Sequence, residues 1–184
     1  MMRLTVKVWV GCWLMLVATG CNPVSMATSA AGAAYKVVRG AEADPTLIRG
    51  AVPGDLAAYR SLRLGEVTTD VPPICTGEVL AKVRAAIIEQ LGDEEAVRAF
   101  PGGGRVLRFD VLCRFFKERG LIGGEGRLDW MVTLRDVESD AVVGLVFVEG
   151  VSESPLQHGV RDMARENTKE LVRFLERRRQ GLPR

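Results

Sequence analysis

The sequence predicts an α+β (α/β) fold: a single mixed, largely antiparallel sheet with two main helices packed on it. Apolar and polar residues alternate over 105–117 and 126–136, which is the spacing of half-buried strands. Apolar residues recur at helical spacing over 76–91 and again near the C-terminus. Short connections between the strands favour an antiparallel meander, and the expected order is β-α-β-β-β-α.

The first half of this domain contains one expected strand and one main helix. The strand covers 59–71, and Gly65 interrupts its alternation, which suggests a bulge. A helix is expected over 76–91 with Thr76 as its cap and Gly92 just past its end. A short helical turn is expected from Asp93 to Phe100, before Pro101.

The second half is expected to contain three strands and the last helix. The strands cover 105–117, 126–136 and 141–149, and the third is apolar on both faces, as a central strand would be. Ser154 and Pro155 form a cap and first-turn pair that opens the helix. Its inward stripe is expected to consist of Val160, Met163, Ala164, Asn167, Leu171, Val172 and Leu175.

The N-terminus has the pattern of an export signal. A basic start precedes an apolar run over 8–17, which is shorter than the roughly 20 residues that a membrane-spanning helix needs. The small residues that follow end at Gly20 and Cys21, which resembles the lipobox of bacterial lipoproteins. The resemblance implies cleavage between Gly20 and Cys21 and attachment of diacylglycerol to the Cys21 thiol. Asn22 in place of Asp then favours an outer-membrane location facing the periplasm.

Three regions follow from this reading: a signal peptide over 1–20, a flexible tether over 21–58 and a domain over 59–180. The tether is rich in small residues and poor in large apolar ones. Without residues 1–20 the chain has 25 − 2 = 23 Lys and Arg against 23 Asp and Glu. A chain with this balance, and no basic stripe interleaved with aromatic residues, gives no sign of nucleic-acid binding.

Cys75 and Cys113 are the cysteines that remain in the domain. An envelope compartment permits a disulfide between them, but their apolar neighbours are equally typical of free core cysteines. One histidine and two separated cysteines do not give the ligand spacing of a zinc site. No metal and no cofactor is therefore expected.

Two stretches carry a resemblance to a known family. The first combines 107–110 with the glycines Gly120, Gly123, Gly124 and Gly126 and with Leu128; the second combines 132–136 with Val143-Gly144 and Glu149-Gly150. Together they resemble the domain of unknown function 4410 family of bacterial lipoproteins over roughly residues 60–178. The resemblance implies a fold similar to the amino-terminal domain of TolB and to curli-secretion lipoproteins. The glycines here are more compressed than in that family, and the turn after Asp136 lacks its Thr-Gly.

The glycines 120–126 are expected to shape a hairpin, because strand alternation resumes after them and a phosphate loop would need a helix there. Asp110, Arg114, Asp129 and Arg135 occupy outward strand positions suited to cross-strand ion pairs. Trp130 occupies an inward position of the fourth strand and is most simply a core residue.

The sequence thus predicts a lipid-anchored envelope protein, tied to the membrane through Cys21, that is not an enzyme. Its domain is expected to bind an envelope protein or a second copy of itself. Two alternatives remain open. One is a periplasmic thiol or hydrolytic enzyme that uses Cys75 or Cys113 with His158. The other is a small-ligand or glycan binder on the sheet face around Trp130.

Overall fold

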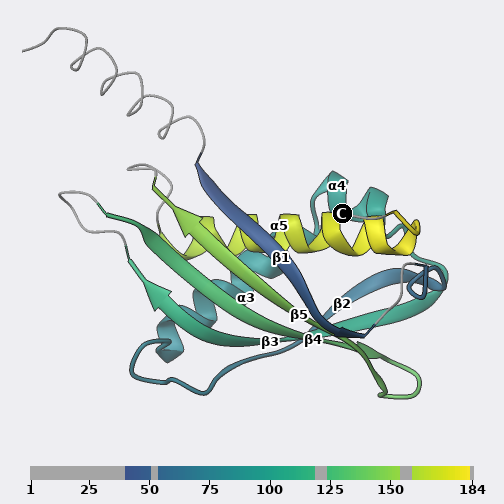
Figure 1. Cartoon of the computed structure of the whole chain (residues 1–184), viewed down its shortest axis with the longest axis horizontal. Coiled ribbons are helices and arrows are strands. Elements are labelled where there is room, and N and C mark those ends of the chain that lie inside the picture. The colour runs from purple at the N-terminus through teal and green to yellow at the C-terminus, as the bar shows by residue number, and fades with distance from the viewer. Residues whose placement is uncertain (1–39, 51–53, 119–123, 154–158, 183–184) are drawn as a thin grey trace, which may run out of the picture. The chain divides into compact units, whose positions relative to one another are not determined.

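The computed structural model describes residues 40–50, 54–118, 124–153 and 159–182. They belong to one compact unit, Val37–Arg184, with a five-stranded mixed sheet and three helices (Figure 1). The predicted α+β fold with helices packed on a mixed sheet is confirmed. The signal peptide 1–20, Cys21 and the chain up to residue 39 lie outside the described residues.

The described residues form five strands and three helices. In order they are β1 (Ala41–Gly50), β2 (Tyr59–Thr69), α3 (Gly77–Leu91), α4 (Glu94–Ala99), β3 (Arg105–Lys117), β4 (Gly126–Asp136), β5 (Val142–Ser152) and α5 (Val160–Arg179). The predicted bounds of β3 and β4 are confirmed to the residue, while β5 extends three residues beyond Glu149. The predicted opening of the last helix at Ser154-Pro155 lies outside the described residues, and α5 begins at Val160.

The strands lie in the order β1-β5-β4-β3-β2. β3, β4 and β5 form the predicted antiparallel meander, and β1 adds antiparallel to β5. β2 runs parallel to β3, because α3 and α4 carry the chain back across the sheet between them. The register of β2 on β3 shifts between Leu64 and Val67, so the predicted bulge around Gly65 is confirmed.

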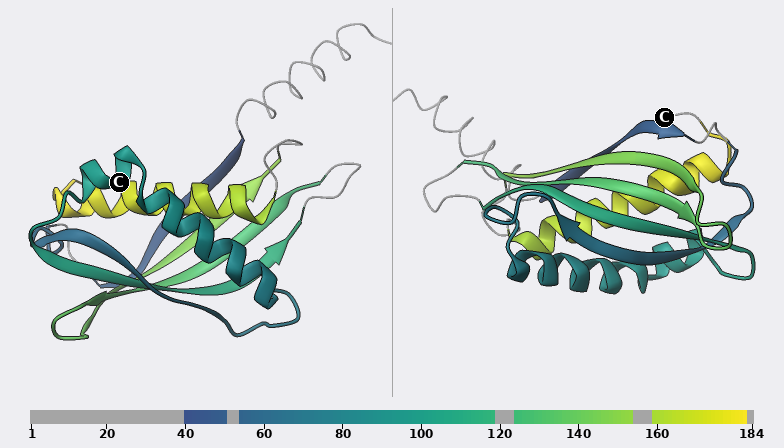
Figure 2. Two further views of the ribbon diagram at one scale, coloured as in Figure 1. Left: turned by 180° about the vertical axis from the view of Figure 1, so that it is seen from behind. Right: turned by 90° about the horizontal axis from the view of Figure 1, so that it is seen from below.

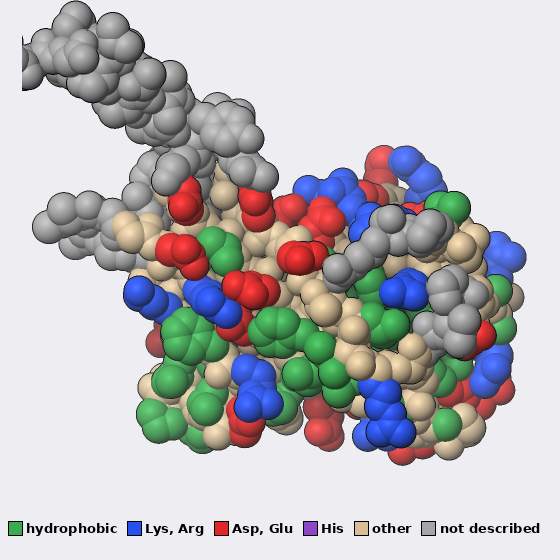
Figure 3. Space-filling model, viewed as in Figure 1, with side chains coloured by type: hydrophobic (Ala, Val, Ile, Leu, Met, Phe, Trp, Pro, Cys, Tyr) green, Lys and Arg blue, Asp and Glu red, His purple; other side chains and the backbone are tan. Residues whose placement is uncertain are grey.

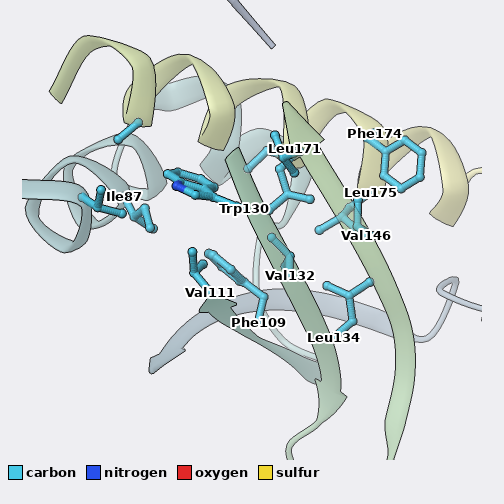
Figure 4. Close-up of a cluster of buried hydrophobic side chains, with 14 of the residues drawn as sticks. Ile87, Phe109, Val111, Trp130, Val132, Leu134, Val146, Leu171, Phe174 and Leu175 are labelled. Atoms are coloured by element: carbon cyan, nitrogen blue, oxygen red, sulfur yellow. The ribbon is translucent and has the colours of Figure 1, made fainter. Parts of the chain in front are cut away.

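Both long helices cover the same face of the sheet (Figure 2). Thr76 caps α3 as predicted, with its hydroxyl accepting from the Val79 amide at 3.4 Å. Every predicted residue of the α5 stripe is buried, from Val160 to Leu175. The core between helices and strands is built on Trp130, Phe109, Ile87 and Leu171, which point toward one another in Figure 4.

The prediction of a tether over 21–58 is wrong for residues 41–50, because these form the edge strand β1. Ala41, Ala43 and Leu47 alternate toward the core and pack on it. Pro45 has no amide proton to donate, and it is tolerated because an edge strand leaves one side unpaired. The small residues and the proline give this strand a weak hydrophobic alternation, which is why the sequence pattern does not predict it. With β1 included, the element order begins with two strands rather than one.

Candidate binding face of the sheet

The face of the sheet that the helices leave uncovered is the candidate site, and we call it the open face. Strand alternation places every second residue there, opposite to the core positions. On the four strands β1, β5, β4 and β3, its residues are Glu42, Asp44, Thr46 and Arg49 of β1; Arg108, Asp110, Leu112, Phe115 and Lys117 of β3; Arg127, Asp129, Met131, Thr133 and Arg135 of β4; and Leu145, Phe147, Glu149 and Val151 of β5.

An apolar row crosses the middle of the open face. Leu112 pairs with Met131, and Met131 pairs with Phe147, so three large side chains from neighbouring strands lie side by side. Each is half-buried, although none of the helices in the described part of the chain covers it. Figure 3 shows hydrophobic side chains gathered over the strands among Lys, Arg, Asp and Glu side chains.

A hollow of about 660 Å³ opens beside this row. Phe115, Met131 and Phe147 supply its apolar lining, and Arg114, Lys117 and Arg127 with Glu125 and Asp129 supply its polar lining. An apolar floor with charged groups around it suits a partner that inserts one apolar side chain and makes polar contacts at the margin.

Asp129 and Arg127 form the best-buried polar pair of the open face. The Arg127 Nε donates to both carboxylate oxygens of Asp129, at 3.0 and 2.9 Å. The Arg127 guanidinium also meets Glu149 at 3.3 Å and lies over the Phe115 ring, 5.8 Å from its centroid. Burial raises the pKa of Asp129, while the Arg127 hydrogen bond opposes that rise. The pair fixes the position of Arg127 over the hollow.

A second ionic cluster lies toward the β4–β5 turn. Arg135 Nε reaches the Asp110 carboxylate at 3.2 Å, which confirms a cross-strand pair between two of the predicted residues. Arg108 bridges the same carboxylate and Asp140, at 3.3 and 2.8 Å. The Glu66 amide donates to the Asp110 carboxylate at 3.1 Å, so a hydrogen bond also connects this cluster to the bulge of β2.

The other two residues expected in cross-strand pairs bind elsewhere. Arg114 pairs with Asp70, beyond the end of β2, at 3.3 Å. Asp129 pairs with Arg127 of its own strand rather than across the sheet. In both cases a bulge in the register between Cys113 and Phe115 shifts the outward positions of β3 relative to β4.

The two domain cysteines are free and buried, so the disulfide considered between Cys75 and Cys113 is not formed. Burial raises the pKa of the Cys113 thiol to about 12, and burial also raises that of Cys75. Both thiols are therefore protonated near neutral pH. His158, the base considered for them, lies outside the described residues.

The remaining predicted site residues divide between described and undescribed segments. Gly20, Cys21, Gly120 and Gly123 lie outside the described residues. Gly124 has a φ of 101°, a conformation that favours glycine, and Gly126 is the buried first residue of β4. Trp130 is fully buried under the helices, which confirms its core position and removes it from any exposed platform.

Within the described segments, no helix has the length and apolar character needed to cross a membrane. The same segments contain no cluster of three or more His, Cys, Asp or Glu side chains placed to hold a metal ion.

Comparisons with known proteins find similar solved structures. PelC from Paraburkholderia phytofirmans, a dodecamer, aligns over 74% of this chain and 97% of its own at 14% identity and a TM-score of 0.42. A substituted PelC from the same organism, also a dodecamer, aligns with the same coverage at 12% identity and a TM-score of 0.46. A "putative lipoprotein" from Caulobacter crescentus CB15 aligns over 68% of this chain and 92% of its own at 15% identity, with a TM-score of 0.36.

Similarity at these TM-scores does not carry assembly or function from one protein to another. The sequence matches no family model and none of the curated proteins. Membership of the domain of unknown function 4410 family therefore stays a prediction.

Sequence patterns alone did not single out Arg127, Met131 and Phe147 as site residues. The relevant signal is present in β5, where Leu145 and Phe147 make the strand apolar on the outward face as well as the inward one. From sequence alone, that signal predicts a central strand. The structure shows that β5 is central in the sheet but open on one side.

Proposed function

We propose that this chain is a lipid-anchored envelope protein whose domain binds another protein, without catalysis, through the open face. The observation that carries the proposal is the apolar row of Leu112, Met131 and Phe147, left uncovered beside a hollow and framed by ion pairs. Contiguous apolar surface with a polar margin is typical of protein-binding sites.

The arrangement of the open face favours a protein over a solvated surface. Large apolar side chains at the centre supply most of the binding free energy of an interface, and the charged margin supplies specificity. Arg127 is already held by Asp129, Glu149 and the Phe115 ring, so it has little rotamer freedom to lose on binding.

The state of the thiols supports a non-catalytic role. A cysteine nucleophile acts as a thiolate, and burial holds the pKa of Cys113 at about 12. Cys75 is also buried with a raised pKa. A thiol or hydrolytic enzyme built on these residues would require a lowered pKa and access for substrate.

The location in this proposal rests on the N-terminal sequence. A basic start, a short apolar run and small residues leading to Cys21 support export and acylation of that cysteine, with the domain facing the periplasm from the outer membrane. Two or three acyl chains anchor a protein stably, because each buried methylene contributes about 0.8 kcal/mol. The partner is then an envelope protein or a second copy of this chain.

A photo-cross-linking residue at position 131 tests the open face in intact envelopes. We expect a specific adduct from position 131, and none from position 88 on the outer surface of α3, where the side chain of Ile88 is 58% exposed. Adducts of equal yield from both positions, or no adduct from position 131, would contradict the proposal. Replacing Phe147 by Ala should reduce the yield at position 131 several-fold, because it removes the neighbouring anchor.

A small organic ligand is a second candidate occupant, because the hollow of about 660 Å³ has the volume of ordinary ligand pockets. A glycan stacked on Trp130 is not an option, since that ring is fully buried. Native mass spectrometry of the protein released gently from envelopes distinguishes the two candidates. A bound small molecule that is lost in the Phe147→Ala variant would support the ligand.

A further inference from the structure

We propose that the open face binds a protein segment with an acidic, a large apolar and a basic residue at alternating positions, lying across the strands over the hollow. This inference rests on the proposed function and specifies the chemistry of its partner. It follows from the charges beside the hollow, which change sign between the β3 side and the β5 and β1 side.

The β3 side of the hollow is basic. Arg114 and Lys117 line it there, and both are exposed. Glu118, the next residue along the chain, lines a different hollow on the helix side of the sheet. Arg114 is paired with Asp70 at 3.3 Å, whereas no carboxylate of the described residues forms an ion pair with Lys117. Lys117 is therefore the cation that is left to meet a partner.

Lys117 also lies directly opposite another cation, because it pairs with Arg127 in the register of β3 and β4. Like charges directly opposite each other destabilise a sheet. Arg127 is compensated by Asp129 and Glu149, at 2.9 and 3.3 Å. The fold thus keeps a cation at position 117 that its neighbours disfavour, and an acidic side chain from a partner would relieve this repulsion.

The opposite side of the hollow is acidic. Glu149 of β5 pairs with Asp44 of β1 and with Asp129 of β4, so three carboxylates lie in one row across three strands. Glu42 follows one row farther along β1. Figure 3 shows Asp and Glu side chains gathered beside the hydrophobic ones on this face. Arg127 brings a single positive charge to this row, so a basic side chain from a partner suits Glu149, whose side chain is 41% exposed.

Strand β4 lies between the two sides and under the centre of the hollow. Its Arg127 has Glu125 and Asp129 two residues to either side, and all three line the hollow. Because Asp129 is bound by Arg127 and is almost fully buried, the centre has little exposed charge of its own. The apolar lining there consists of Phe115, Met131 and Phe147. A large apolar side chain therefore suits the centre, with charged groups to either side of it.

The spacing of the two charged positions matches an extended segment. Lys117 and Glu149 are two strands apart, about 10 Å, and two residues apart along the strands, about 7 Å, so their Cα atoms are separated by about 12 Å. Residues i and i+4 of an extended segment lie about 13 Å apart on the same side, with residue i+2 midway. An acid, an apolar residue and a base at these positions reach Lys117, the hollow and Glu149 together.

A peptide selection tests this chemistry. A random twelve-residue library displayed on phage is selected against the purified full chain in detergent. We expect enrichment of a large apolar residue with opposite charges two residues before and after it, in either order, because the segment can cross the strands in either direction. Charges of one sign, no charge preference or no enrichment at all would overturn the proposal.

Charge exchange on the protein tests the two contacts. For one enriched peptide, measured by fluorescence anisotropy, Lys117→Glu and Glu149→Lys should each weaken binding at least about tenfold. The double variant should recover binding to within about threefold, because the peptide can then bind in the opposite direction. Arg98→Glu on α4, whose side chain is 80% exposed away from the open face, is the matched control and should leave binding unchanged.

A structural role of Lys117 would give a different result. Since a carboxylate at position 117 lies opposite Arg127, Lys117→Glu should keep or raise the urea midpoint while it weakens peptide binding. A double variant no better than the single ones would overturn the proposed charge order. If Phe147→Ala still abolishes peptide binding in that case, the proposed function stands. Absence of both a bound peptide and an adduct from position 131 would overturn both.

Discussion

Cys113 and Cys75 lie in the part of the core between β3 and the start of α3, and burial determines their chemistry. Thr69, which pairs with Cys113 in the sheet, donates its hydroxyl to the Cys113 carbonyl at 2.8 Å. Trp130 pairs with Cys113 on the other side. Each thiol therefore behaves as a small apolar group that fills space in the core.

We predict that neither thiol reacts with a maleimide or an aromatic disulfide in the folded protein at pH 7. Burial and a pKa of about 12 at Cys113 remove both access and thiolate. Counting labelled residues by mass spectrometry before and after unfolding in urea checks this, with both cysteines labelled only after unfolding. Rapid labelling of Cys75 or Cys113 in the native state would revive the thiol-enzyme alternative.

Asp136, the last residue of β4, is another side chain whose pKa is set by burial and hydrogen bonds. Its carboxylate is 1% exposed, accepts from the Ser139 amide and hydroxyl at 2.8 Å each, and meets Arg105 at 2.7 Å. The Ser139 amide is the main reason why the pKa of Asp136 falls to about 2. The charged carboxylate thus stabilises the β4–β5 turn.

This lowered pKa gives a pH-dependent prediction. Since the unfolded carboxyl has a pKa of about 3.9, the stability that Asp136 adds is complete above pH 4 to 5 and is lost as the pH falls toward 2. Asp136→Asn should destabilise the protein near neutral pH, and its difference from the unchanged chain should shrink between about pH 4 and 2. Denaturant titrations at several pH values measure this. Glu94→Gln, at a side chain that is 98% exposed, serves as the control.

Among the elements, β1 shows what sequence patterns miss. The strands β3 and β4 and the helix α3 were predicted almost to the residue, because their apolar residues are large and periodic. β1 has an equally regular alternation, but its inward residues are mostly Ala and Pro, which carry little hydrophobic signal. It forms a strand because it pairs with β5, about 100 residues later in the chain. A short stretch of sequence does not reveal such a distant pairing.

Hydrogen exchange tests whether β1 is part of the stable sheet. Amides of residues 41–50 should exchange far more slowly than those of an unstructured chain, because β5 pairs with this strand along its length. Peptide-level exchange followed by mass spectrometry gives the comparison, with the β5 peptide as the internal reference. Exchange at the rate of a free peptide would show that residues 41–50 are part of a flexible tether and not of the sheet.

Helix α5 packs closely on strand β5 at Gly150. A Cβ on Gly150 would overlap the carboxamide of Asn167, whose nitrogen donates to the Leu128 carbonyl at 3.0 Å. Asn167 is fully buried, so it has no room to move aside. A hydrogen-bonded polar residue in the helix stripe therefore requires glycine on the facing strand.

We expect Gly150→Ala to lower the free energy of unfolding by about 1–3 kcal/mol, the usual cost of overpacking a core. Gly77→Ala is the matched control, because nothing lies within 4 Å of the added Cβ at the start of α3. It should be neutral or slightly stabilising, since alanine favours the helix. Urea titration of both variants measures their free energies of unfolding. Equal changes in the two variants would show that the close approach at Gly150 is not the cause.

At the scale of the whole molecule, the helices among the described residues cover one side of the sheet, and this decides how much the sequence could reveal. The core face could be predicted because each strand and helix carries its own apolar spacing. The open face could not, because Leu112, Met131 and Phe147 become neighbours only through the register of three strands. The ion pairs around them depend on the same register and on the bulge near Phe115.

The anchor also belongs to this scale. Cys21→Ser should move the protein from the membrane fraction to the soluble fraction of the envelope, because it removes the thiol that would carry the acyl chains. Fractionation with immunodetection measures the shift. Mass spectrometry of the mature amino terminus of the unchanged chain should show an acylated residue 21, and an unmodified terminus would contradict the anchor.

Because β1 begins at Ala41, it sets the reach of a domain attached at Cys21. The chain between them has 41 − 21 = 20 residue steps, compared with 59 − 21 = 38 if the domain began at Tyr59. At most about 3.5 Å per step, the domain can rise about 70 Å from its anchor point instead of about 130 Å. In the proposed anchored form, this length limits how far from the membrane surface the domain can stand when it meets a partner.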